Sequence, residues 1–92
     1  MSSSHAQPPL IEFPCDYQFK IFGPAAAEAG FVAAVQEAAG TVLPICLDAM
    51  RVRESGQGRY LCVTLVARLH NREQLDRLYA AFRALPQLLY LL

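Results

Sequence analysis

The stretch of residues 59–69, RYLCVTLVARL, alternates regularly between two sets of side chains. From Leu61 to Leu69 its odd-numbered members are all apolar, while its even-numbered members mix polar and apolar residues. Successive side chains of a β-strand point to opposite faces, so this pattern predicts a strand with one face in a core. Such a strand needs hydrogen-bonded neighbours on both edges and helices over its apolar face. We therefore expect residues 59–69 to form the central strand of the fold.

The length and composition indicate one small folded domain. The chain has 92 residues, of which 54% are hydrophobic and 17% charged, a balance that argues against intrinsic disorder. This is more apolar than a small monomer usually needs and indicates a surface for a partner. Serines and prolines at the start predict a mobile tail over residues 1–12, in which His5 has no role. We expect residues 13–92 to form the single domain.

Charge and cysteine usage argue against several classes of protein. Eight basic and eight acidic residues give a net charge of zero, without the basic excess typical of nucleic-acid binding, although a local cluster on one face stays open. Cys15, Cys46 and Cys62 form no CxxC pair and have no histidine at ligand spacing, so we expect reduced thiols, no metal and no cofactor. We see no signal peptide and no apolar run of membrane-spanning length, which predicts a cytoplasmic protein without a membrane segment.

The first half of the chain predicts a strand followed by a helix. Alternation over residues 16–22, DYQFKIF, indicates the first strand. Gly23 and Pro24 should end this strand, with Pro24 as the first residue of a helix that runs to about Ala39. Phe31, Val35 and Ala38 should face the core, and Gly40 should end the helix. The placement of residues 41–47 stays open.

The second half predicts a hairpin, a helix and a last strand. Residues 48–54 should form a strand, and the glycines of the loop at 55–58 should turn it into the strand at 59–69, antiparallel to it. Asn71 and Gln74 have the spacing of a helix-capping pair. The helix that follows has one apolar stripe and ends before Pro86, and residues 87–92 should form a short buried strand. The stripe consists of Leu75, Leu78, Tyr79, Phe82 and Leu85.

This order of elements predicts the ferredoxin-like βαββαβ sandwich, an α+β fold with both helices on one face of a four-stranded antiparallel sheet. The first and third strands should lie at its centre, with Tyr17, Phe19 and Ile21 directed inward. The helix-free face is then a candidate partner surface, and the alternative is an ordinary half-polar sheet surface. The candidate residues are Lys20, Phe22, Tyr60, Cys62, Thr64, Val66 and Arg68.

Residues 13–17, FPCDY, and residues 19–23, FKIFG, resemble the opening signature of the YbeD-like family of small bacterial proteins. The similarity extends from about Glu12 to Leu92. It implies a ferredoxin-like fold close to the ACT regulatory domains, an unassigned function and no catalytic residues. ACT domains often bind effectors at a glycine-bearing turn between the first strand and the first helix. Here that turn would be residues 22–24, where Pro24 lacks one backbone donor.

We consider three classes of function. The first is a regulatory or interaction module that binds a small effector, a partner protein or a second copy through the open sheet face or a strand edge. The second is an RNA-binding module, since RNA recognition motifs share this topology, but Leu61 stands where their signature has glycine, and Cys62 where it has an aromatic. The third is an enzyme, which we do not expect, because Cys62 and His70 lie too far apart along an extended strand and the carboxylates are scattered.

Overall fold

The computed structural model describes residues 11–92, apart from the side chain of Leu47. Within this range the chain forms four strands and two α-helices, with a 3-10 turn before the first helix and another before the second strand. In chain order the elements are β1 (Cys15–Pro24), η2 (Ala25–Ala27), α1 (Glu28–Gly40), η3 (Leu47–Ala49), β2 (Met50–Ser55), β3 (Tyr60–Leu69), α2 (Arg72–Arg83) and β4 (Tyr90–Leu91).

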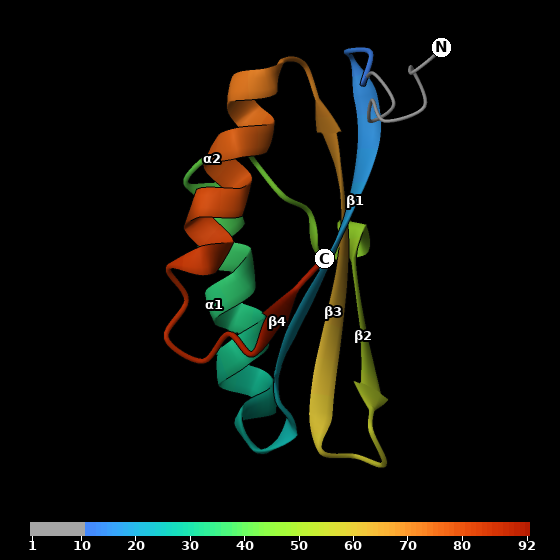
Figure 1. The fold of residues 1–92 in the computed structure, drawn as a ribbon, viewed down its shortest axis with the longest axis vertical. Coiled ribbons are helices and arrows are strands. Elements are labelled where there is room, and N and C mark those ends of the chain that lie inside the picture. Colours follow the sequence, from blue (N-terminus) through green and yellow to red (C-terminus); the bar gives the residue numbers. More distant parts are fainter. Residues whose placement is uncertain (1–10) are drawn as a thin grey trace, which may run out of the picture.

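The four strands form one antiparallel sheet in the order β2-β3-β1-β4. Both α-helices lie against the same side of this sheet, and within residues 11–92 no α-helix lies on its other side (Figure 1). This confirms the predicted ferredoxin-like α+β sandwich with β1 and β3 at the centre. Of the predicted tail, residues 1–10, including His5, lie outside the described residues, while Ile11 and Glu12 are exposed.

The alternation of β3 corresponds directly to burial. Its odd-numbered side chains, from Leu61 to Leu69, are all buried under the helices. In β1, Phe19 and Ile21 are fully buried and Tyr17 is half-buried, as the alternation of that strand predicts. The inward faces of the two central strands therefore supply the sheet side of the core.

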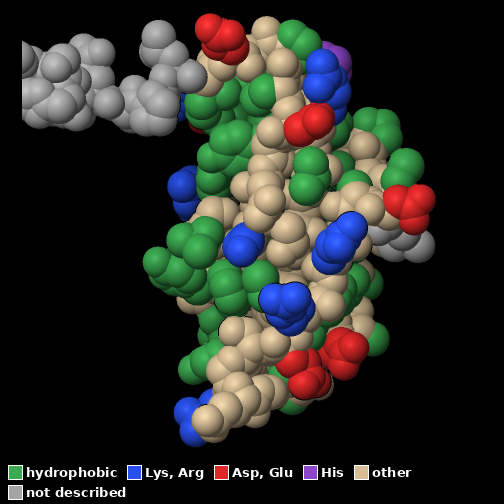
Figure 2. All heavy atoms as spheres, turned by 90° about the vertical axis from the view of Figure 1, so that its right-hand side faces the viewer, with side chains coloured by type: hydrophobic (Ala, Val, Ile, Leu, Met, Phe, Trp, Pro, Cys, Tyr) green, Lys and Arg blue, Asp and Glu red, His purple; other side chains and the backbone are tan. Residues whose placement is uncertain are grey.

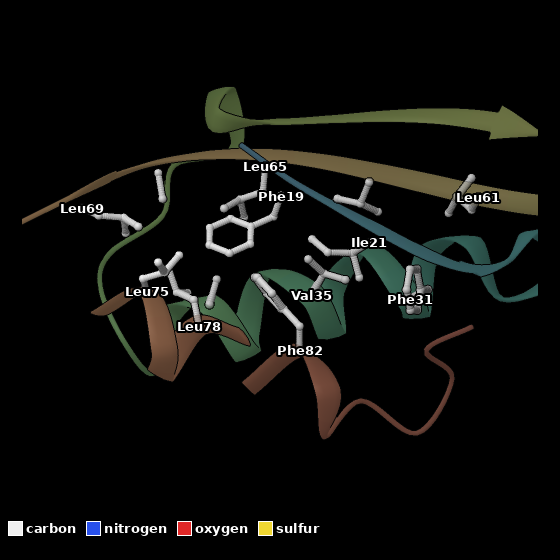
Figure 3. Packing of buried hydrophobic residues seen from close by; sticks show 13 residues of the cluster. Phe19, Ile21, Phe31, Val35, Leu61, Leu65, Leu69, Leu75, Leu78 and Phe82 are labelled. Atoms are coloured by element: carbon white, nitrogen blue, oxygen red, sulfur yellow. The ribbon is translucent and has the colours of Figure 1, made fainter. Parts of the chain in front are cut away.

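The helices supply the other side of the core (Figure 3). From α1, the buried residues are Phe31, Val35 and Ala39, so the four-residue spacing continues to Ala39 and the predicted Ala38 is only partly buried. From α2, the buried residues are Leu75, Leu78 and Phe82, with Tyr79 and Leu85 packed at the margin, as predicted. Val42, Leu43 and Ile45 of the connection after α1 also pack against this core.

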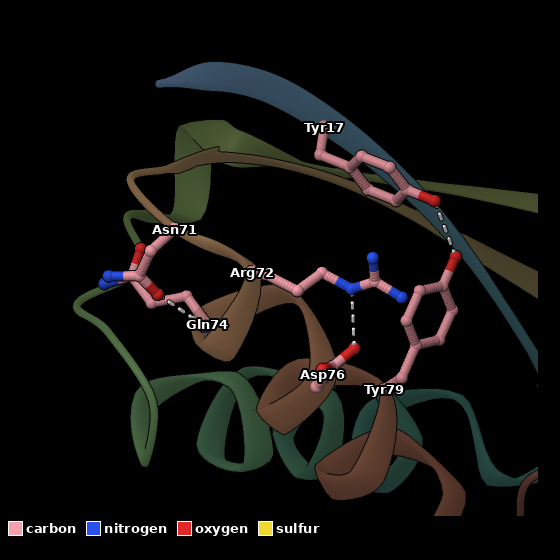
Figure 4. A network of polar contacts seen from close by, with 6 residues as sticks. All are labelled: Tyr17, Asn71, Arg72, Gln74, Asp76 and Tyr79. Atoms are coloured by element: carbon pink, nitrogen blue, oxygen red, sulfur yellow. Dashed lines mark hydrogen bonds and ion pairs between the residues drawn. The ribbon is translucent and has the colours of Figure 1, made fainter. Parts of the chain in front are cut away.

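The beginning of α2 is capped as its sequence predicts. The side chain of Asn71 accepts a hydrogen bond from the backbone N–H of Gln74 at 2.9 Å (Figure 4). In return, the Gln74 side chain accepts from the backbone N–H of His70 at 2.8 Å, one residue before the cap. Two N–H groups near the helix start are thereby satisfied, which fixes where β3 ends and α2 begins.

Replacing Asn71 with alanine should lower the free energy of unfolding by about 1 kcal/mol, because the Gln74 N–H loses its acceptor. Urea denaturation followed by circular dichroism measures this difference. Asn71→Ser is the matched control, since a serine hydroxyl can accept the same hydrogen bond and should keep most of the stability. Equal losses in the two variants would contradict a capping role for Asn71.

A pair of tyrosines closes the core between β1 and α2. The hydroxyls of Tyr17 and Tyr79 lie 2.9 Å apart (Figure 4). Burial, together with this hydrogen bond, raises the pKa of Tyr79 to about 12, so its hydroxyl is protonated at neutral pH. The guanidinium of Arg83 lies 5.4 Å from the centre of the Tyr79 ring. The two hydroxyls satisfy each other at the margin of an apolar core.

The prediction that Pro24 begins the first helix was wrong. Pro24 is the last residue of β1, with φ −74° and ψ 134°, and it pairs with Tyr60. The N–H of Ala25 donates to the carbonyl of Arg59 at 3.1 Å, so pairing with the β3 side continues past the proline. The φ of proline suits a strand end as well as a helix start, and here the strand ladder decides. A 3-10 turn follows, and α1 begins only at Glu28.

The helix α1 ends at Gly40, as predicted, and the hydroxyl of the following residue, Thr41, donates to the carbonyl of Ala38 at 2.7 Å. Two other boundaries differ from the prediction. The second strand begins at Met50 because η3 occupies the residues before it. The last strand is only Tyr90–Leu91 and is not buried, since Leu89, Tyr90 and Leu92 are more than half exposed. As an edge strand, β4 has only one strand neighbour to cover it.

Candidate functional site

The register of β1 against β3 places all seven candidate residues on the helix-free face of the sheet. Lys20 lies opposite Thr64, and Phe22 lies opposite Cys62. Residues directly opposite one another in an antiparallel pair point to the same side, away from the buried odd-numbered residues. Tyr60, Val66 and Arg68 continue this row along β3. We call this side of the sheet the open face.

The seven side chains differ in how far they are covered. Tyr60 and Val66 are each 42% exposed, whereas Phe22 and Thr64 are half-buried. Cys62 is covered by neighbouring side chains, and its Sγ lies 4.0 Å from Thr64 Oγ1. The accessible part of the open face is therefore formed by the longer side chains around Cys62.

The outer strands add residues that the sequence prediction did not include. Arg51 lies opposite Thr64 and Arg53 opposite Cys62, so both arginines of β2 point to the open face. On the other side, Tyr90 lies opposite Phe22. Leu92 exchanges two backbone hydrogen bonds with Lys20, at 2.8 and 3.0 Å, and continues β4. The alternation of Met50 to Arg53 is visible in the sequence, but the face to which it points depends on the register of the hairpin.

Lys20, Arg51 and Arg53 form a cation cluster at the middle of the open face. They line a hollow of about 640 Å³ together with Gln18, Val52, Cys62 and Thr64. Figure 2 shows Lys and Arg side chains gathered over the middle of this face, with Asp and Glu toward its periphery. All three cations are exposed, and within residues 11–92 none of them forms an ion pair.

The open face has little acidic charge of its own. Among the strand residues directed to it, Asp16 is the only acid, and its carboxylate already pairs with Arg68 at 3.3 Å. A chain with zero net charge therefore presents a locally positive surface, because most of its acids lie elsewhere. Such a surface raises the local concentration of anions.

Phe22, Tyr60 and Tyr90 form an aromatic cluster beside the cation cluster. The ring centres of Phe22 and Tyr90 are 6.0 Å apart, and with Tyr60 and Leu89 they line a hollow of about 380 Å³. The hairpin loop fixes Tyr60, since a Cβ added to Gly56 would lie 2.5 Å from its ring. Gly56, Gln57 and Gly58 all have positive φ, and for the two glycines this conformation was predicted from the sequence. Hydrophobic side chains occupy one flank of the open face in Figure 2.

The glycine-bearing segment at residues 22–24 does not form a turn. Gly23 is a buried strand residue, and a Cβ built on it would lie 2.6 Å from two ring atoms of Phe31. Phe31 therefore fills the space above this backbone, where the resemblance to ACT domains would place an effector. We find no room for a ligand at this position.

The other sites considered from the sequence offer no further cluster. Cys15, Cys46 and Cys62 are free thiols. Over residues 11–92 no three His, Cys, Asp or Glu side chains come together in a way that could hold a metal ion. In that same range, each helix is too short or too polar to cross a membrane.

Comparison with known proteins identifies relatives of nearly the same length. The family model described as protein of unknown function (DUF493) matches residues 8–92. A UPF0250 protein of Nitrosomonas europaea is 38% identical over 84 residues, covering 90% of this chain and 94% of the relative. A UPF0250 protein of Paraburkholderia phytofirmans is 40% identical over 82 residues, covering 84% of this chain and 85% of the relative.

The fold also matches a solved structure. The solution structure of protein HP0495 from H. pylori superposes with a TM-score of 0.74, and the match covers 100% of this chain and 96% of the H. pylori chain. The sequence identity is 13%, so this likeness concerns the fold alone. The ferredoxin-like arrangement is thus shared with a protein of distant sequence.

Proposed function

This chain belongs to the DUF493 family of small bacterial proteins, and we propose that it is an interaction module that binds carboxylate groups through the cation cluster of its open face. DUF493 is the YbeD-like family that the opening residues resemble, and it is described as having unknown function. The observation that carries the proposal is the shared hollow of Lys20, Arg51 and Arg53, three exposed cations without an acidic partner in residues 11–92. Arginine forks match carboxylates in geometry as well as charge.

The carboxylates have two conceivable sources, a small acidic effector and an acidic segment of a partner protein. In both cases the module would act by binding, in the cytoplasm, and its role would be regulatory rather than catalytic. Thr64 and Gln18 support the proposal, because a hydroxyl and an amide beside the cations add neutral donors to the same hollow.

Binding of single-stranded RNA is the second candidate, because the open face combines cations with aromatic residues. Phosphates contact the cations and bases stack on aromatic rings in proteins of this kind. The net charge of zero and the small number of cations favour the carboxylate proposal. The two candidates predict different ligands for the same surface.

Reversing one charge of the cluster should weaken anion binding by about tenfold or more, because the attraction between an arginine and a carboxylate becomes a repulsion. We expect Arg53→Glu to have this effect on hexaglutamate, measured by amide chemical shifts in a titration at low salt. The matched control is Arg77→Glu, which reverses an exposed charge on α2. In the wild type, the shifts should concentrate in β1, β2 and β3.

The same titration distinguishes between the possible anionic ligands. Free glutamate, hexaglutamate and a uridine hexanucleotide are each added to the wild type. Tighter binding of the oligonucleotide at equal salt would favour RNA, and shifts for free glutamate at the cluster would favour a small effector. Equal weakening by Arg53→Glu and Arg77→Glu, or no shift on the open face, would refute the proposal.

A further inference from the structure

We infer that the occupant of the open face is an extended acidic segment of a partner protein, with an aromatic or large apolar side chain a few residues from its acidic ones. The cation cluster takes the acidic residues, and the aromatic cluster takes the apolar side chain. This inference rests on the proposed function and adds the class of partner.

The two clusters belong to one continuous surface. Lys20 and Phe22 are two residues apart on β1, which is about 6.6 Å along a strand. Across the sheet, Arg53, Cys62, Phe22 and Tyr90 lie in one row on four neighbouring strands. Three strand spacings of about 4.8 Å separate Arg53 from Tyr90 by about 14 Å. A peptide crosses this distance in about four extended residues.

The shape of the open face favours a polymer over a small molecule. The hollow at the cations and the hollow at the aromatic rings have separate linings and both lie on an exposed sheet surface. A small ligand is usually surrounded over most of its area. A small acid could contact one hollow but would leave the other uncovered, whereas an extended segment contacts both.

Charge argues against a second copy of this chain as the occupant. Two open faces packed together would bring cation clusters of the same sign into one interface, and the single acid on each face already pairs with Arg68. Like charges placed opposite one another in an interface repel and oppose association. An acidic partner has the complementary sign.

The packing of the rings argues against nucleic acid. The Phe22 ring lies beside Tyr90, and one side of the Tyr60 ring lies against Gly56. Tyr90 is 61% exposed, but its ring is inclined by 57° to that of Phe22, so the two rings do not offer parallel faces to successive stacked bases. The rings form the walls of an apolar hollow, which suits a side chain inserted from above.

Four synthetic peptides test this inference by fluorescence anisotropy. Two carry three glutamates, the spacer Gly-Ser-Gly and a phenylalanine, in the two possible orders, and the other two have alanine in place of phenylalanine. We expect the better phenylalanine peptide to bind about tenfold more tightly than its alanine version, from burial of the ring.

Variants of the protein assign this gain to the aromatic cluster. Tyr90→Ala should remove the advantage of phenylalanine and leave the alanine peptides unchanged. Ile11→Ala is the control, since Ile11 is an exposed apolar side chain, 41% accessible, that lines neither hollow. Arg53→Glu should weaken all four peptides. Because Tyr90 is 61% exposed, its truncation should leave the fold intact.

The outcomes distinguish this inference from the proposed function. If no peptide binds, the carboxylate proposal itself fails. If all four bind equally to the wild type, anion binding stands and the aromatic anchor is refuted. A uridine hexanucleotide that binds more tightly than the best peptide would make nucleic acid the occupant. A dimer in sedimentation equilibrium that Tyr90→Ala dissociates would make it a second copy.

Discussion

Replacing Phe82 with alanine should lower the free energy of unfolding by about 3–5 kcal/mol. Phe82 is fully buried, and its ring meets that of Phe19 edge-on, with centres 5.3 Å apart. Phe19 in turn lies 5.0 Å from the Tyr79 ring, so Phe82 closes one end of an aromatic group at the middle of the core. Removing the ring leaves a cavity that the surrounding sheet and helices cannot fill.

Urea denaturation measures this loss, and it is large because small domains are stable by only about 5–15 kcal/mol. Phe22→Ala is the matched control, since it removes the same ring from the open face, where Phe22 is only half-buried. We expect its cost to be clearly smaller. A Phe82→Ala protein that unfolds at the same urea concentration as the wild type would show that the packing of Figure 3 is wrong.

Much of the fold follows from two sequence periods. The odd-numbered residues of β3 and the apolar stripe of α2 are each buried as a set, because periods of two and of about 3.6 residues fix which side chains share a face. The cap at Asn71 is similarly local, since donor and acceptor lie three residues apart. Features set within one element could therefore be predicted from the sequence.

Features set between elements could not be predicted in the same way. The φ of Pro24 permits both a strand end and a helix start, and only the hydrogen bond from Ala25 to Arg59 selects the strand. The residues around β4 are apolar, which suggests burial, but as an edge strand with one neighbour it leaves Tyr90 exposed. In both cases the neighbouring strand determines the result.

The same distinction, between features set within one element and features set between elements, applies to the candidate site. The contributions of β1 and β3 were predicted, because both strands alternate and their buried faces are unambiguous. Arg51 and Arg53 were missed as site residues, since a slip of one residue in the hairpin would turn them to the helix side. In the structure Ser55 lies opposite Tyr60, and this register directs Arg51 and Arg53 to the open face. The cation cluster, on which the proposed function rests, depends on this register.

Gly23 carries the second large prediction. Replacing it with alanine should lower the free energy of unfolding by about 1–3 kcal/mol, because the new methyl group overlaps the ring of Phe31. Phe31 is 1% exposed, so its ring can move away from the new methyl group only if neighbouring side chains move with it. The backbone of Gly23 is ordinary strand, so the cost comes from contact with the ring and not from backbone strain.

Gly30→Ala is the control for this prediction, measured by the same urea denaturation. Gly30 lies in α1 with no atom within 4 Å of an added Cβ, so alanine should there raise the stability by up to about 1 kcal/mol. Phe31→Leu combined with Gly23→Ala should cost less than the two single changes together, because the smaller side chain relieves the overlap. Additive losses, or a neutral Gly23→Ala, would mean that Phe31 does not fill the space above Gly23, and that segment would again be open to an effector.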